Sequence, residues 1–139
     1  MPKIGVRLPG DFDSAGEFLA DVQALESAGA DLLLLAEGSL DREILLAAMA
    51  AVTARVQLHA PKAGNTLERL ARGRLAGDLE GWKEVDFPVD RTAWRATLAE
   101  HEGAGVSGLI LGMDARLIDL LRNPDLEDDR ANDLQLAQG

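Results

Sequence analysis

Ionisable side chains stand near the predicted ends of several strands, where they could transfer protons or bind a charged ligand. The candidate catalytic residues are His59, Glu37, Arg7 and Asp86, with Asp114 as a further carboxylate. The carboxyl ends of parallel strands meet on one rim, so the loops there would bring these groups together. An imidazole near a carboxylate can transfer a proton near neutral pH, and an arginine can bind an anionic ring or a carboxylate.

A structural interpretation of the same residues stays open. Arg7 could pair with Glu84 or Asp86 on neighbouring strands, and His59 could be a hydrogen-bonded histidine at an interface. The other histidine, His101, comes late in a predicted helix, where the helix dipole favours its cation, and we expect it to be structural. Two histidines far apart in the sequence, with no accompanying pattern of carboxylates, predict no metal site.

The middle of the chain holds a local cluster of positive charge, in which Arg69, Arg72 and Arg74 flank Gly73. Such a cluster could bind the phosphate of a flavin, because arginine recognises phosphate through several parallel hydrogen bonds. More often such a cluster only balances a strongly acidic surface. No serine lies in a nucleophile-elbow sequence, and neither a phosphate loop nor a dinucleotide fingerprint is present.

Composition excludes several classes of function. The net charge of −10 repels phosphate backbones and anionic lipid, so we expect neither nucleic acid nor a membrane as a partner. The absence of cysteine excludes disulfides, thiolate metal sites and cysteine nucleophiles. No apolar run has the length of a membrane span, and no apolar signal core follows Met1, which predicts a cytoplasmic protein.

The elements that must position these groups alternate between strand and helix. Strands are predicted from apolar or alternating runs at residues 3–8, 32–36, 55–60, 82–87 and 108–112. Helices are predicted after the capping residues Ser14, Asp41 and Asp90, from Asp114, and over residues 66–72. Residues 73–81 read as a glycine-punctuated loop. Residues 1–124 then form one domain, and residues 125–139 form a C-terminal tail.

The joint between helix and strand occurs twice in the sequence. Residues 26–35 and 102–111 each contain the last turn of a helix, a glycine that ends it (Gly29 and Gly105), and an apolar run of strand length. The same offset also aligns the two caps and places Phe18 opposite Trp94. The repeat predicts two β-α-β units, whose right-handed crossovers would make their strands parallel.

Polar strand faces distinguish between two parallel architectures. Three predicted strands carry a polar or small face, formed by Gly5 with Arg7, Gln57 with His59, and Glu84 with Asp86. In a doubly wound sheet both faces are covered by helices, and the strands are apolar throughout. One polar face indicates a barrel lumen or an interface instead, although about five strand-helix units are too few for a closed barrel. We therefore predict an α/β fold of parallel (βα) units forming a partial TIM-barrel-like sheet, completed by dimerisation into a homodimer.

The chain resembles the bacterial luciferase-like flavin-dependent monooxygenases, a family built on an eight-unit barrel. The resemblance lies in Ile4-Gly5-Val6-Arg7-Leu8-Pro9, in residues 25–31 and 51–58, and in residues 94–112 with 120–124. The family's central units have no counterpart in the short segment 63–81. Many members carry a Glu-His pair after the second strand, where Glu37 is followed by Gly38.

This resemblance implies an oxidoreductase or monooxygenase that uses FMN or a deazaflavin and acts on a small organic substrate. Arg7, His59 and Glu37 would then stand at the rim of the active site. The alternative is a chain that binds no cofactor, a non-catalytic dimeric barrel remnant that serves as a binding or assembly protein.

Overall fold

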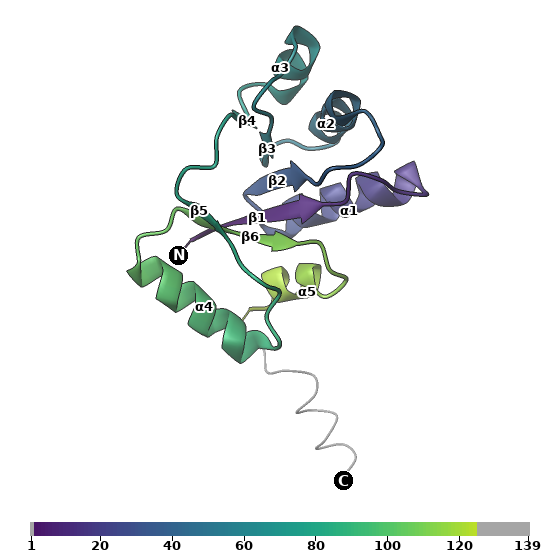
Figure 1. Ribbon diagram of the computed structural model, residues 1–139. Coiled ribbons are helices and arrows are strands. Elements are labelled where there is room, and N and C mark those ends of the chain that lie inside the picture. The colour runs from purple at the N-terminus through teal and green to yellow at the C-terminus, as the bar shows by residue number, and fades with distance from the viewer. Residues whose placement is uncertain (1, 125–139) are drawn as a thin grey trace, which may run out of the picture.

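The computed structural model describes residues 2–124 of the 139-residue chain, so the predicted tail at 125–139 lies outside the described residues. Within the described residues, six parallel strands form one sheet in the order β4-β3-β2-β1-β6-β5. The sheet is curled into a half-barrel (Figure 1). The strands are β1 (Lys3–Leu8), β2 (Leu32–Leu35), β3 (Gln57–His59), β4 (Leu75–Ala76), β5 (Trp82–Glu84) and β6 (Gly108–Gly112). The helices are α1 (Ala15–Ala28), α2 (Arg42–Ala51), α3 (Asn65–Ala71), α4 (Arg91–Gly103) and α5 (Leu117–Arg122). The predicted α/β fold of parallel units in a partial barrel is thereby confirmed, whereas its completion by dimerisation stays a prediction.

Helix caps lie where the sequence predicts them. The side chains of Ser14, Asp41 and Asp90 each accept a hydrogen bond from a backbone N–H three residues later. These bonds satisfy amides that have no partner inside the helix. The last helix differs, because Asp114 accepts from the nearby backbone N–H of Arg116 and the helix begins only at Leu117.

The segment predicted as a loop contains a strand. β4 has two residues and pairs in parallel with β3, with Leu75 opposite Leu58. A strand this short shows no periodicity in the sequence, so only its pairing reveals it. The sheet therefore has one strand more than the five that the sequence predicts.

The two faces of the sheet bury different sets of side chains. The main core lies between the sheet and the helices and includes Val6, Leu33, Leu58 and Leu109 from the four central strands, which are all fully buried. A smaller cluster lies on the concave face, where Leu32, Leu34 and Ile110 pack with Ala76, Leu79 and Trp82. Successive side chains of a strand point to opposite faces, which explains why neighbouring leucines of β2 divide between the two cores.

A short connection requires the sheet to curl. β4 and β5 lie at opposite edges of the sheet, and Figure 1 shows the chain running between them without a helix. The six residue steps from Ala76 to Trp82 span at most about 22 Å when fully extended. A flat sheet would separate the two edges by about 24 Å, and the chain must also return from the end of β4 to the start of β5.

The indole of Trp82 fills the amino-terminal half of the concave face. Trp82 lies opposite Gly108 in the register of β5 and β6, and a methyl group on Gly108 would overlap its ring. A methyl group on Gly5 of the next strand would stand 3.1 Å from the same ring. Leu32 and Leu34 are therefore buried within a single chain, and no second copy is needed to cover them. The homodimer stays a prediction.

Glu26, near the end of α1, binds the backbone that leads into β3. Its carboxylate accepts hydrogen bonds of 2.7–3.1 Å from the backbone N–H groups of Ala54, Arg55 and Val56, which lead into β3. Partial burial raises the pKa of Glu26, but these three amides outweigh burial and lower the pKa below its ordinary value of 4.5. The end of α1 is thereby tied to the start of β3.

Replacing Gly108 with alanine should destabilise the protein by about 1–3 kcal/mol, because the added methyl group displaces Trp82 from the concave core. Gly112 is the matched control on the same strand, since a methyl group there meets no atom within 4 Å. Urea unfolding of the two variants measures the difference. Equal midpoints for G108A and G112A would show that the tryptophan does not support the sheet.

Glu26→Gln should cost about 2 kcal/mol at pH 7, because the glutamine NH₂ group cannot accept from the three amides. Because the pKa of Glu26 is lower in the folded protein than in the unfolded chain, its carboxylate stabilises the folded state at pH values above 4.5, the ordinary pKa. This stabilisation is lost as the pH falls through the pKa that Glu26 has in the folded protein. The difference in the free energy of unfolding between wild type and E26Q should therefore shrink below pH 4.5. Glu100→Gln, on the exposed surface of α4, controls for the change in charge.

Candidate functional site

Two of the predicted site residues lie on the concave side of the sheet, near the carboxyl ends of their strands. Val6 and Leu58 point toward the helices, so their neighbours Arg7 on β1 and His59 on β3 point toward the concave side. Leu34 of β2, which is Arg7's partner in the strand register, lies between them. This half of the concave face is polar, in contrast to the half that Trp82 fills.

Arg7 forms an ion pair with Glu84, as the structural interpretation of the sequence predicts. The two residues are on β1 and β5, which are not neighbours, because β6 lies between them. Arg7 stands opposite Gly112 in the register of β1 and β6, and its side chain extends past β6 to Glu84. Both side chains are partly exposed, at 38% and 59%, so the pair contributes about 1 kcal/mol or less.

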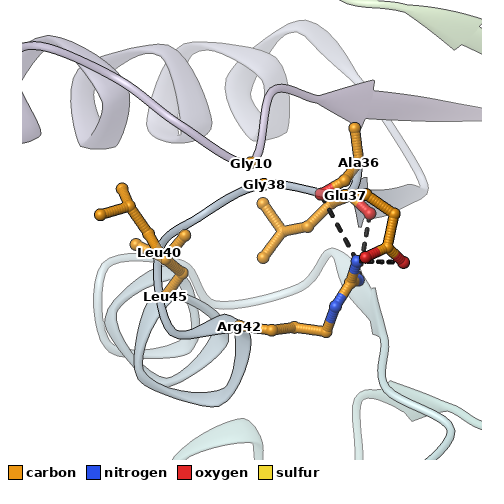
Figure 2. A pocket seen from close by; sticks show the side chains of 8 residues that line it. Gly10, Ala36, Glu37, Gly38, Leu40, Arg42 and Leu45 are labelled. Atoms are coloured by element: carbon orange, nitrogen blue, oxygen red, sulfur yellow. Dashed lines mark hydrogen bonds and ion pairs between the residues drawn. The ribbon is translucent and has the colours of Figure 1, made fainter.

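Sequence reasoning missed a second arginine of the site. Arg42 is the first residue of α2, and its guanidinium returns to the carboxyl end of β2, where it donates to the carbonyl oxygens of Leu35 at 3.0 Å and Ala36 at 3.4 Å (Figure 2). A third hydrogen bond, of 3.5 Å, reaches the carboxylate of Glu37. Arginine has five N–H groups, so two of them make no hydrogen bond to another described residue. A signal was available, since an arginine that opens a helix soon after a strand lies near the end of that strand.

His59 is half-buried and makes no hydrogen bond to another residue in the described part of the chain. Burial lowers the pKa of its imidazole below the ordinary 6.5, and the positive charges of Arg42 and Arg7 lower it further. The ring is therefore neutral at pH 7, with one nitrogen that donates and one that accepts. Arg7, Arg42 and His59 together form what we term the basic rim cluster.

The carboxylates predicted for the site do not join His59. Glu37 has a fully exposed side chain and pairs only with Arg42 among the described residues. Asp86 is exposed and forms no ion pair within the range 2–124. Asp114 pairs with Arg116, whose hydrogen bonds lower the pKa of the Asp114 carboxyl to about 2. The guanidinium of Arg116 also lies over the ring of Phe87. The groups that act on His59 are two arginines, so the structure offers it an anion-binding environment rather than a proton-transfer partner.

The predicted phosphate-binding arginines have different surroundings. Arg74 is 8% exposed, and its guanidinium donates to Ala71, Ala50, Val56 and twice to Thr53, through both the hydroxyl and the carbonyl. These bonds use all five N–H groups of Arg74, so its guanidinium is part of the scaffold, and phosphate binding by this cluster stays a prediction. Arg69 and Arg72 are exposed.

The second histidine, His101, lies outside the basic rim cluster. His101 is buried, and its Nδ1–H donates to the carbonyl oxygen of Thr97 at 2.9 Å, in agreement with the structural role expected for it. No group of three or more histidine, aspartate or glutamate side chains that could hold a metal ion occurs among residues 2–124. No helix in that range is both long and apolar enough to cross a membrane.

A shallow pocket adjoins the basic rim cluster. It holds about 330 Å³ of space, open solvent included, and it shares Arg42 with the cluster. Its other lining residues come from the end of β2, from the loops after β1 and β2, and from the start of α2, namely Gly10, Leu35, Ala36, Glu37, Gly38, Leu40 and Leu45. A side chain on Gly10 would overlap the carbonyl of Ala36, so the two loops meet there backbone to backbone.

Arg7→Met should raise the pKa of His59, because one of the two positive charges that disfavour the imidazolium is removed. The pKa can be followed by NMR titration of the Cε1–H resonances. Only two histidines are present, so His101 serves as an internal reference in the same spectrum. An unchanged or lowered His59 pKa would contradict the convergence of Arg7 and His59.

No family model, curated protein or solved structure matched this chain, so the interpretation of the site rests on the arrangement of its own residues.

Proposed function

We propose that this protein is a binding protein for a small ligand that carries a carboxylate or phosphate group, held by the basic rim cluster. The observation that supports this proposal is that Arg7 and His59 lie on the concave side of the two strands that flank β2, while Arg42 stands at the carboxyl end of β2 itself. The positive charges of both arginines also lower the pKa of the half-buried His59. The two guanidinium groups supply directed N–H donors, and the imidazole supplies one more. A small anion is the ligand that such a set of donors recognises.

The carboxylates that pair with these arginines are exchangeable. Glu84 is 59% exposed and Glu37 is fully exposed, so both return to water at little cost when a ligand takes their place. His59 needs no such exchange, because it has no hydrogen-bond partner among the described residues. The ligand therefore replaces weak pairs and gains a new contact.

Binding fits the site better than acid-base catalysis does. A general base needs a group that orients it and stabilises its protonated form, as a carboxylate does. The two charges that act on His59 are positive, and they disfavour its protonated form. The sequence analysis leaves a non-catalytic binding or assembly protein open as the alternative to an enzyme. We propose the binding role, with a small molecule as the ligand.

Flavin-dependent oxidoreductase activity on a small organic substrate is the second candidate. The strand order favours it, because deleting two adjoining units from a closed eight-unit barrel would leave strands in the order β4-β3-β2-β1-β6-β5. FMN would also present a phosphate to the same arginines. The two candidates are distinguished by whether FMN or a deazaflavin changes its visible absorbance when mixed with the protein, which simple anion binding does not require.

Titration with acetate and with inorganic phosphate should shift the NMR resonances of His59 and raise its pKa, because an anion favours the imidazolium. The affinity for the anion should rise as the pH falls through the pKa that His59 has in the complex. It should level off once the pH is below the pKa that His59 has in the free protein. Arg42→Met should weaken binding about tenfold, the effect of losing one charge-assisted contact. Arg69→Met is the matched control, since Arg69 is exposed on α3.

Sodium chloride at equal ionic strength controls for screening in this titration. If neither anion moves the His59 resonances relative to those of His101, the proposed function is wrong. Equal loss of affinity in R42M and R69M would also contradict it, because the effect would then come from the overall charge.

A further inference from the structure

We propose that the ligand of the basic rim cluster is a zwitterion, an α-amino acid with an aliphatic side chain. This inference rests on the proposed function and specifies its ligand. Arg42 belongs to the basic rim cluster and also lines the neighbouring pocket, so one ligand can use both. The pocket then defines which groups accompany the carboxylate.

Charges of both signs stand side by side at the mouth of the pocket. Figure 2 shows the guanidinium of Arg42 and the carboxylate of Glu37 meeting at the end of β2, where they are 3.5 Å apart. An α-amino acid carries the complementary pair, a carboxylate next to an ammonium group. It can take the place of both halves of this ion pair, with its carboxylate on Arg42 and its ammonium on Glu37.

The overall charge of the protein favours such a ligand over a simple anion. The net charge of −10 repels a free carboxylate before it reaches the arginines. A zwitterion has no net charge and is not repelled at long range. The ammonium group also occupies Glu37, which a simple anion would leave without a partner.

Leucine side chains line the same pocket as this charged pair. Leu40 is 39% exposed, and Leu45 lines the same pocket from the first turn of α2. Figure 2 shows these two side chains next to each other, between the backbone at Gly38 and the helix. An aliphatic ligand side chain can cover Leu40 and remove its apolar surface from water.

The test compares L-leucine with 4-methylpentanoate, which is leucine without its amino group, by NMR titration of His59. We expect leucine to bind about fivefold more tightly, the effect of one exposed ion pair. Glu37→Gln should abolish this preference. Glu68→Gln, which changes the net charge equally from the exposed surface of α3, should retain it. Glycine should bind more weakly than leucine, and Leu40→Ser should reduce that difference.

The outcomes separate the two proposals. If 4-methylpentanoate binds as tightly as leucine, the zwitterion inference is overturned while anion binding stands. A leucine preference that persists in E37Q overturns the role of Glu37. If acetate and phosphate also leave His59 unchanged, the proposed function fails and the inference fails with it.

Discussion

The packing of Trp82 against two glycines is the contact on which the rest of the structure depends. The indole occupies the space over Gly108 and Gly5 that side chains would otherwise fill, and it covers the concave face from the edge strand β5. With Leu32, Leu34 and Ile110 buried beneath this cover, a sheet with helices on one side gains a second core. A half-barrel can therefore bury its concave leucines within one chain, without the remaining units of a closed barrel.

This apolar filling also determines where chemistry can occur. Apolar side chains and the indole of Trp82 fill much of the amino-terminal half of the concave face, where Gln57 is the exposed polar residue of β3, and the charged residues lie at the carboxyl-terminal rim. There, the side chain of Arg7 crosses β6 to pair with Glu84. A glycine on β6 thus contributes to this division of the concave face, since Gly108 admits the indole of Trp82.

Local signals in the sequence predicted most of the elements but not every contact between them. The caps Ser14, Asp41 and Asp90 depend on residues three positions away, so their hydrogen bonds can be foreseen without a tertiary structure. β4 has no such signal, because two residues cannot show a period and its identity depends on pairing with β3. Polar strand faces could be foreseen because alternation along a strand is also local. The sequence offered Glu84 and Asp86 as partners of Arg7 on a neighbouring strand, and Arg7 pairs with Glu84, although β6 lies between their strands.

The site could be predicted only in part because long side chains can bond far from their place in the sequence. Arg74 and Arg42 carry the same guanidinium group; Arg42 follows the predicted helix cap Asp41, and Arg74 lies in the predicted loop 73–81. Arg74 is directed inward, to the carbonyls at the end of α2, and becomes part of the scaffold. Arg42 is directed over the open end of β2, where the last carbonyls of the strand satisfy only some of its donors. The difference lies in what surrounds each guanidinium, and that depends on how neighbouring loops pack. An arginine becomes a binding residue when the fold leaves some of its donors unsatisfied beside an accessible surface.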